Sequence, residues 1–140
     1  MSERTAALVA RHVGGDRVAI AVRGHELIAD QPLDAGGEDA GPTPTEVFLA
    51  GLAACVTFYA GRFLRRHDLS TEGLVVACDY TCAAEPARVG AITLAIDAPG
   101  LPQERSEAFR RVVEHCSVHN TLRFPPEVRF EFRRSLAGIS

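Results

Sequence analysis

Four segments of the chain alternate apolar and polar residues, the pattern expected of β-strands with one buried face. They span residues 17–23, 74–82, 90–97 and 127–133. Two further short strands are expected at residues 6–10 and 25–29, beside the first of these. Gly14-Gly15-Asp16 is a turn signal, so segments 6–10 and 17–23 should pair as a hairpin. In the last segment we expect Val128, Phe130 and Phe132 to point inward.

The longest apolar run, residues 47–60, lies in a helix predicted from Thr43 to about His67. Thr43-Pro44-Thr45-Glu46 has the form of a capping box, with Thr43 at the N-cap and Glu46 at the third helical position. The first half of this helix is apolar on all sides, so it must be covered on every side. The other elements of one 140-residue chain can hardly do this, and a second subunit is the simplest cover.

A second helix is expected from Gln103 to Cys116. Its apolar residues fall at i, i+3, i+4 and i+7, which is the spacing of one buried stripe: Phe109, Val112, Val113 and Cys116. Phe124-Pro125-Pro126 ends the helical region. Residues 117–122 could start a new short helix, and Cys116 would then lie near its positive end, a position that favours the thiolate.

The order of these elements (strands, helix, strands, helix, strand) indicates an α+β protein, and 140 residues suggest one domain over residues 1–140. A formal net charge of −3 argues against a nucleic-acid partner. The 14-residue apolar run is too short to span a bilayer, and the N-terminus does not resemble a secretory signal. We therefore expect a cytoplasmic protein without a membrane partner, whose four cysteines are mostly reduced.

Cys55 and Cys116 are the candidates for chemistry. They lie in the two apolar helices, 116 − 55 = 61 residues apart. If the helices pack together, the two thiols meet in a water-poor pocket suited to redox chemistry on an apolar substrate. Apolar walls could come from three residues of the first helix: Phe48, Leu52 and Tyr59. The simpler interpretation is that each cysteine is a small core residue, and the sequence leaves both interpretations open.

The remaining cysteines and the histidines give weaker signals. Cys78 and Cys82 share a strand face, too far apart along it for a disulfide, and are expected to be packing residues. Cys116 and His119 have a spacing that a metal site can use, but a structural zinc site needs about four ligands. We expect no metal and no other cofactor.

Two segments resemble a known family. Residues 41–55, GPTPTEVFLAGLAAC, resemble the helix of the OsmC/Ohr family, and residues 116–122, CSVHNTL, resemble its second cysteine segment. The resemblance implies an intertwined homodimer, in which antiparallel sheets from both chains surround two long central helices and the sites lie at the interface.

The resemblance also implies a thiol peroxidase that reduces organic hydroperoxides in defence against oxidative stress. By similarity, Cys55 attacks the peroxide and becomes a sulfenic acid. Cys116 then resolves it as a disulfide, which an external dithiol reduces.

The chain departs from the best-characterised members of that family at three positions. Their glutamate stands ten residues before the first cysteine, where this chain has Thr45, with Glu46 one later. Glu46 lies on the helix face opposite Cys55, so it could support the thiols only through a loop or a partner subunit. Arg17 is the nearest counterpart of their activating arginine, and Ser117 stands where a proline usually follows the second cysteine.

These departures are typical of the broader OsmC-like branch, so a second class of function stays open. The chain could be a dimeric protein that binds a small molecule, with its cysteines only lining the site. It could also be a thiol redox partner or sensor without peroxidase activity.

Overall fold

The computed structural model describes residues 7–134. Antiparallel strands and helices alternate along this part of the chain, which confirms the predicted α+β class. The elements are β1 (Val9–Gly14), β2 (Arg17–Val22), β3 (His25–Ala29), α1 (Pro44–Arg66), β4 (Val75–Ala83), β5 (Arg88–Asp97), α2 (Ser106–Val113) and α3 (Ser117–Arg123), with single 3-10 turns at Leu33–Ala35 and Gln103–Arg105.

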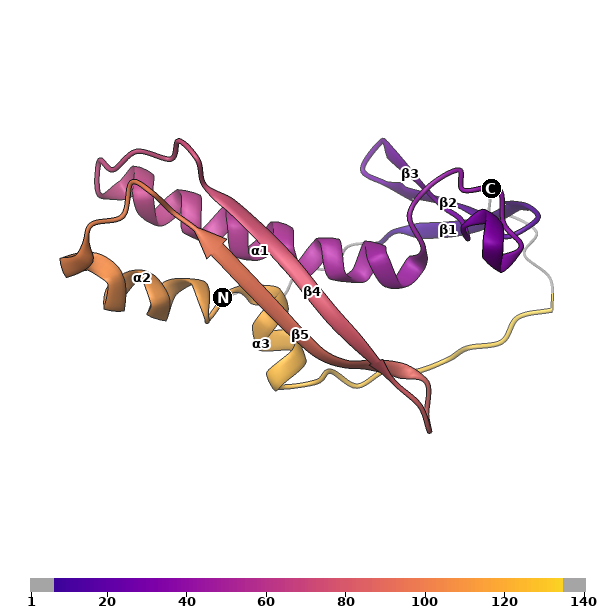
Figure 1. Ribbon diagram of the computed structural model, residues 1–140. Helices are drawn as coiled ribbons and strands as arrows, with labels where there is room; N and C mark the ends of the chain where they lie inside the picture. The colour runs from indigo at the N-terminus through magenta and orange to yellow at the C-terminus, as the bar shows by residue number, and fades with distance from the viewer. Residues whose placement is uncertain (1–6, 135–140) are drawn as a thin grey trace.

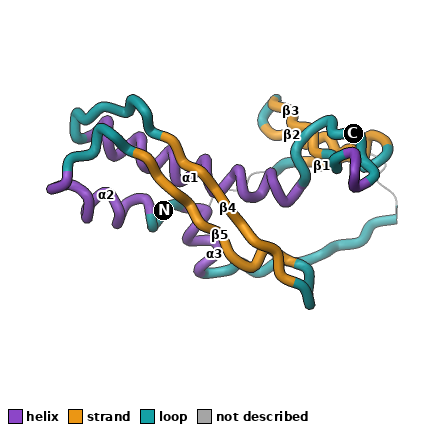
Figure 2. The backbone as a smooth tube through the Cα atoms, in the orientation of Figure 1, coloured by secondary structure: helices purple, strands orange, loops and turns teal. Residues whose placement is uncertain are grey.

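Helix α1 is the element around which the others are arranged (Figure 1). The β4–β5 ribbon crosses one side of it, and α2 runs beside its C-terminal half. The sheet β1–β2–β3 lies near the N-terminal end of α1 (Figure 2). Both thiol-bearing segments predicted from the sequence therefore lie on the same layer of helices, behind the β4–β5 ribbon.

Strands β1, β2 and β3 form an antiparallel meander. Ala19 at the centre of β2 faces Arg11 of β1 and Ile28 of β3. The predicted hairpin between the first two strands is confirmed, and its turn contains Gly14 and Gly15, with φ values of 130° and 53° that favour glycine. Ala6, with which the first strand was predicted to begin, lies outside the described residues.

Helix α1 begins and ends where the sequence predicts. The Thr43 hydroxyl accepts a hydrogen bond from the Glu46 N–H at 3.1 Å, and the Glu46 carboxylate accepts one from the Thr43 N–H at 2.8 Å. This reciprocal pair is a complete capping box. In the last turn, Arg65 and Arg66 place positive charge at the negative end of the helix dipole.

By length and composition, α1 could also cross a membrane, since it has 23 residues and an 18-residue window with a mean hydropathy of 1.7. The sequence-based membrane prediction used a 14-residue run, which is shorter than this window because it ended before the first charged residue. An apolar helix of this kind is also found in the core of soluble proteins. In the part of the chain described here, α1 buries a continuous stripe against its neighbours: Leu49, Leu52, Val56, Ala60, Phe63 and Leu64.

The loop before α1 is organised by one buried carboxylate. Asp30 is 1% exposed and accepts hydrogen bonds from the backbone N–H groups of Gln31, Glu38 and Ala40 at 2.7, 3.2 and 3.0 Å. At Gly41, a Cβ atom would lie 2.1 Å from the Ile28 carbonyl oxygen, so only glycine fits there. The predicted loop is therefore fixed, and it leads directly into the cap of α1.

The predicted second helix is shorter than expected. Helix α2 covers only Ser106–Val113, because the chain leaves the helical conformation after Glu114, and Cys116 has extended backbone angles of −69° and 156°. Cys116 is instead the N-cap of α3. The prediction of a new short helix after Cys116 is confirmed, whereas the prediction of Cys116 inside the second helix is wrong.

The predicted strand at residues 127–133 is absent from the described chain, so that prediction is also wrong. The segment pairs with no strand among residues 7–134. Its apolar side chains point outward instead of inward, with Val128, Phe130 and Phe132 exposed by 69%, 80% and 91%. A strand requires a neighbour for its backbone N–H and C=O groups, and the described part of the chain offers none here.

Candidate functional site

Cys55 lies in the middle of α1, on a half-buried position. It packs against the main apolar cluster, which α1 forms with Phe109, Val113 and Cys116. Strand β5 covers the same cluster with the alternating residues Ile92, Leu94 and Ile96. The thiol is thus held by a helix and surrounded by apolar groups, and it is a free cysteine.

Cys116 is fully buried and is also free. Its sulfur accepts a hydrogen bond from the His119 backbone N–H at 3.4 Å, as the N-cap of α3. The next residue ties α3 to α1, because the Ser117 and Tyr59 hydroxyl groups are 3.0 Å apart. Two helices from distant parts of the sequence therefore fix the position of this sulfur.

The structure brings the two predicted thiols together. Burial raises the pKa of Cys116 above its ordinary value of 9.0. The backbone N–H groups of His119 and Val118 lower this pKa, whereas the neighbouring Cys55 thiol raises it further. The sequence predicted that the helix end would favour the Cys116 thiolate, and this was wrong in direction because burial outweighs the N-cap hydrogen bonds.

The two predicted supporting residues lie elsewhere in the chain. The Glu46 carboxylate is engaged in the capping box at the start of α1. Arg17 lies at the start of β2 and forms an ion pair with Glu38 in the following loop. In this chain neither side chain is hydrogen-bonded to Cys55 or Cys116 within the described residues.

The three predicted pocket residues take different positions along α1. Leu52 is buried and lines a cavity of about 300 Å³ together with Ile92, Leu94 and His119. Tyr59 lines a separate cleft between α1 and α2. Phe48 is 45% exposed, so its role depends on what covers α1.

The histidines around Cys116 form hydrogen bonds to backbone carbonyl groups. The Nδ1 atoms of His115 and His119 donate to the carbonyl oxygens of Arg111 and Glu114, both at 2.6 Å. Among residues 7–134, no group of three or more His, Cys, Asp or Glu side chains is arranged to hold a metal ion. Cys78 is half-buried and Cys82 is exposed, where the strand β4 carries an irregularity between Thr81 and Cys82.

One contributor to the site was not predicted from the sequence. Ser117 was noted only as a departure from a motif, yet its hydroxyl group joins Tyr59 beside the buried sulfur. The two residues are 58 positions apart in the sequence, and no local sequence pattern predicts a contact over that separation.

A family model described as OsmC-like protein matches residues 36–131 of the chain. The chain belongs to the OsmC-like protein family. Both thiols and the whole of α1 lie within the matched residues. The resemblance stated from residues 41–55 and 116–122 is thereby confirmed.

Solved structures of OsmC-like proteins share the fold. The OsmC-like protein from Mycoplasma pneumoniae gives a TM-score of 0.72 at 20% identity, over 87% of this chain and 89% of that chain. The organic hydroperoxide resistance protein OsmC from Legionella pneumophila gives 0.66 at 24% identity, over 88% and 92%. The organic hydroperoxide resistance protein OhrB of Bacillus subtilis gives 0.60 at 21% identity, over 87% and 93%.

At these identities the likeness establishes the fold alone. A comparison with curated proteins gives no match. The functional argument therefore depends on the thiol site of this chain.

Proposed function

We propose that this OsmC-like protein is a cysteine-based peroxidase that reduces organic hydroperoxides, with Cys55 as the attacking thiol and Cys116 as the resolving thiol. The observation that carries the proposal is that both thiols lie in one apolar cluster, close enough for Cys55 to influence the pKa of Cys116. A pair of free thiols in contact can pass reversibly to a disulfide, which a single core cysteine cannot do.

The surroundings of the pair support this assignment of roles. Burial and the neighbouring Cys55 raise the pKa of Cys116, so Cys116 is a thiol that holds its proton. A protonated Cys116 can donate a hydrogen bond to a Cys55 thiolate and stabilise it. Cys55 is also the less buried of the two, which leaves it open to a substrate.

The two thiols supply the electrons for one reduction of peroxide, and an external reductant closes the cycle. The Cys55 thiolate attacks the outer oxygen of ROOH, so that an S–O bond forms, the O–O bond breaks and the alkoxide takes a proton to leave as ROH. The Cys116 sulfur then attacks the Cys55 sulfenic sulfur, and the hydroxyl group leaves as water with the Cys116 proton. An external dithiol supplies two electrons and two protons to restore both thiols.

The substrate expected from the lining is apolar close to its peroxide group. Leu52, Ile92 and Leu94 line the cavity on the β5 side of α1. Such a surface favours an organic hydroperoxide over hydrogen peroxide, because an apolar group gains free energy when it leaves water. We place the reaction in the cytoplasm, where thiol systems keep cysteines reduced between turnovers.

The functional unit is proposed to be a homodimer. The single chain has an accessible surface of 10922 Å², whereas a compact monomer of 15.0 kDa exposes about 7,000 Å². Phe48 and Phe58 on α1 are 45% and 53% exposed, in agreement with the sequence argument that one chain cannot cover this helix. A second copy would cover α1 and complete the walls around each pair of thiols.

The segment 127–133 gives a second reason. Its alternation of apolar and charged residues suits a strand, yet it pairs with no strand among residues 7–134. In a dimer it can pair with a sheet edge that includes the partner's backbone and can bury Val128, Phe130 and Phe132. The same interface is where Glu46 and Arg17 could support the thiols of a partner, since Glu46 cannot reach Cys55 in its own helix.

Stoichiometric oxidation tests the assigned roles. Reduced protein treated with cumene hydroperoxide should lose two thiols per chain and gain a Cys55–Cys116 disulfide, identified by mass analysis. Cys55→Ser should consume no hydroperoxide. Cys116→Ser should complete one oxidation and then pass to the sulfinic acid with excess peroxide, because nothing resolves the sulfenic acid. Cys82→Ser removes an exposed thiol and should match the wild type.

The same experiment separates this function from the alternatives. A wild-type protein that consumes no organic hydroperoxide with any dithiol reductant is not a peroxidase, and a ligand-binding function then accounts better for the fold. Disulfide formation with general oxidants but no hydroperoxide turnover would instead indicate a thiol redox partner or sensor.

A further inference from the structure

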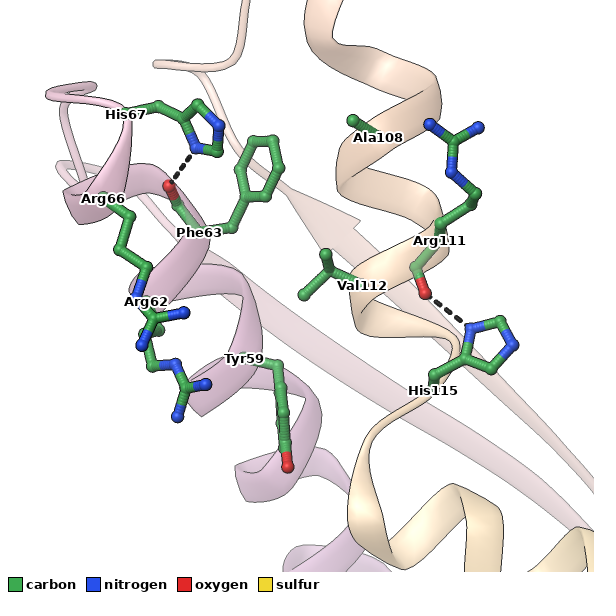
Figure 3. Close-up of a pocket in the computed structure, with 9 residues that line it drawn as sticks. All are labelled: Tyr59, Arg62, Phe63, Arg66, His67, Ala108, Arg111, Val112 and His115. Carbon is green, nitrogen blue, oxygen red and sulfur yellow. Dashed lines mark hydrogen bonds between the residues drawn. The ribbon is translucent and has the colours of Figure 1, made fainter.

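We propose that the cleft between α1 and α2 binds an amphipathic organic anion, with a carboxylate or phosphate head and an apolar tail. The cleft has a volume of about 640 Å³ and is lined by both helices (Figure 3). That volume is within the range of small-molecule sites, which is about 300–1,000 Å³. Both walls come from one chain, and no cysteine is among the lining residues.

Positive charge is concentrated at the cleft. Arg62 and Arg66 lie on the α1 side and Arg111 on the α2 side (Figure 3). No aspartate or glutamate lines the cleft, and among residues 7–134 ion pairs at 4.0 Å or less involve only other arginines. Three guanidinium groups thus line one cleft together, although the net charge of the chain is −3. An arginine matches a carboxylate or phosphate through two parallel hydrogen bonds.

The space between the two rims is apolar. Phe63 and Val112 face each other across it, with Ala108 above and the Tyr59 ring below (Figure 3). Phe63 is held in place by Phe109, at 5.4 Å between ring centroids. A ligand that places an apolar tail here and its charged head at the rim satisfies both parts of the lining.

The helix dipoles of α1 and α2 do not by themselves explain why arginines line the cleft. The last turns of α1 and α2 contain Arg65, Arg66, Arg110 and Arg111, and any of them would suit the negative ends of these helices. Only Arg66 and Arg111 of these line the cleft. Arg62 stands one turn earlier on α1, where its guanidinium lies over the Tyr59 ring at 5.6 Å.

The histidines at the cleft are oriented by the helices themselves. The His67 ring donates from Nδ1 to the Phe63 carbonyl oxygen at 2.9 Å and stacks near the Phe63 ring. The His115 ring donates from Nδ1 to the Arg111 carbonyl oxygen. Each ring is therefore fixed at the rim, and Nε2 of a neutral ring is then an acceptor, so recognition of an anionic head falls to the arginines.

This site goes beyond the proposed peroxidase function, and it can be tested apart from it. Undecanoate, decyl phosphate and the uncharged 1-decanol share a decyl tail and differ in the head group. We expect the full-length protein to bind at least one of the two anions about tenfold more tightly than 1-decanol, because charge-assisted hydrogen bonds add to the burial of the tail. The tighter anion identifies the head group.

Matched variants locate the binding. Arg66→Gln with Arg111→Gln should weaken anion binding about tenfold and leave 1-decanol binding within about twofold. Arg65→Gln with Arg110→Gln removes the same charge from the same two helical turns outside the cleft, and should leave anion binding within about twofold. A Cys55→Ser protein should bind the anion like the wild type, even if it has lost all hydroperoxide turnover.

Several results would overturn the proposal. Equal affinity for the anions and 1-decanol would show that the arginines do not recognise the head group. An equal loss in the two double variants would reduce the effect to general electrostatics. Absence of measurable binding at millimolar ligand, in a protein whose circular dichroism spectrum shows it folded, would show that the cleft takes no such ligand.

Discussion

Cys116 is the residue at which opposite influences meet on one thiol. As the N-cap of α3 it receives backbone N–H groups that favour a thiolate, and its burial among apolar residues favours the thiol. Sulfur is a weak hydrogen-bond acceptor, and α3 has only seven residues, so the first influence is small. Burial therefore decides the direction of the pKa shift.

This direction predicts how stability depends on pH. The unfolded chain releases the Cys116 proton near the ordinary pKa of 9.0, whereas the folded chain holds it to higher pH. The contribution to stability is thus fully present below about pH 9 and is lost as pH rises through the folded pKa. Urea unfolding between about pH 8 and pH 11 should show a fall in the unfolding free energy.

Two variants identify the group responsible. Cys116→Ala should be less stable than the wild type at neutral pH, because it leaves a cavity, but its stability should fall less steeply at high pH. Cys82→Ala removes an exposed thiol and should keep the wild-type slope. An unchanged slope in Cys116→Ala would contradict the assignment.

At the scale of residues, the sequence was enough to select the two thiols but not their environment. Cys55 and Cys116 were predicted from residue type and apolar surroundings, and these signals are local. The hydrogen bond between Tyr59 and Ser117 was not predicted, because it exists only once α3 has packed against α1. From the sequence alone, the arginines of the cleft look like solvated residues near helix ends. Their common site exists only once α2 lies beside α1.

At the scale of elements, features set by local chemistry were predicted well. The capping box fixed the start of α1, and the turn residues fixed the β1–β2 hairpin. The end of α2 was not predicted, because the apolar stripe continues to Cys116 while the backbone turns out of the helix before it. The residue identities alone do not show whether the helix continues along the apolar stripe or ends before Cys116.

The cap of α1 gives a prediction at this scale. Thr43→Ala removes the acceptor for the Glu46 N–H, and should reduce the unfolding free energy by about 1 kcal/mol. Thr45→Ala changes the same residue type two positions later, where the side chain has no capping role, and should have a smaller effect. Denaturant unfolding of the two variants measures the difference. Equal losses would show that the capping bond adds nothing to stability.

At the scale of the whole molecule, segment 127–133 shows what one chain cannot specify. Its alternation of residues suits a strand, but a strand also needs a neighbour, and the described chain provides none. In the proposed homodimer, a second copy supplies that neighbour. The exposed apolar residues of α1 likewise need a covering surface that the described chain does not provide.

A homodimer in solution is therefore the expected outcome of sedimentation, with about twice the 15.0 kDa mass of the chain. Phe130→Glu should shift the equilibrium towards monomer, because it places a charge on the apolar face of the segment. Arg129→Glu places the same group on the opposite face and should shift it less. A wild-type protein that stays monomeric at micromolar concentration would contradict the dimer, and with it the proposed completion of the thiol site.

The distance in sequence between the two thiols has a thermodynamic consequence. A bridge from Cys55 to Cys116 would close a loop of about sixty residues, and in the chain-entropy model this stabilises the folded state by roughly 4 kcal/mol. The oxidised protein would then resist unfolding more than the reduced one. In the proposed peroxidase cycle, each turnover would carry the molecule through a rigid oxidised form and a looser reduced form. Proteases, which cleave opened chains, would then act mainly on the reduced form.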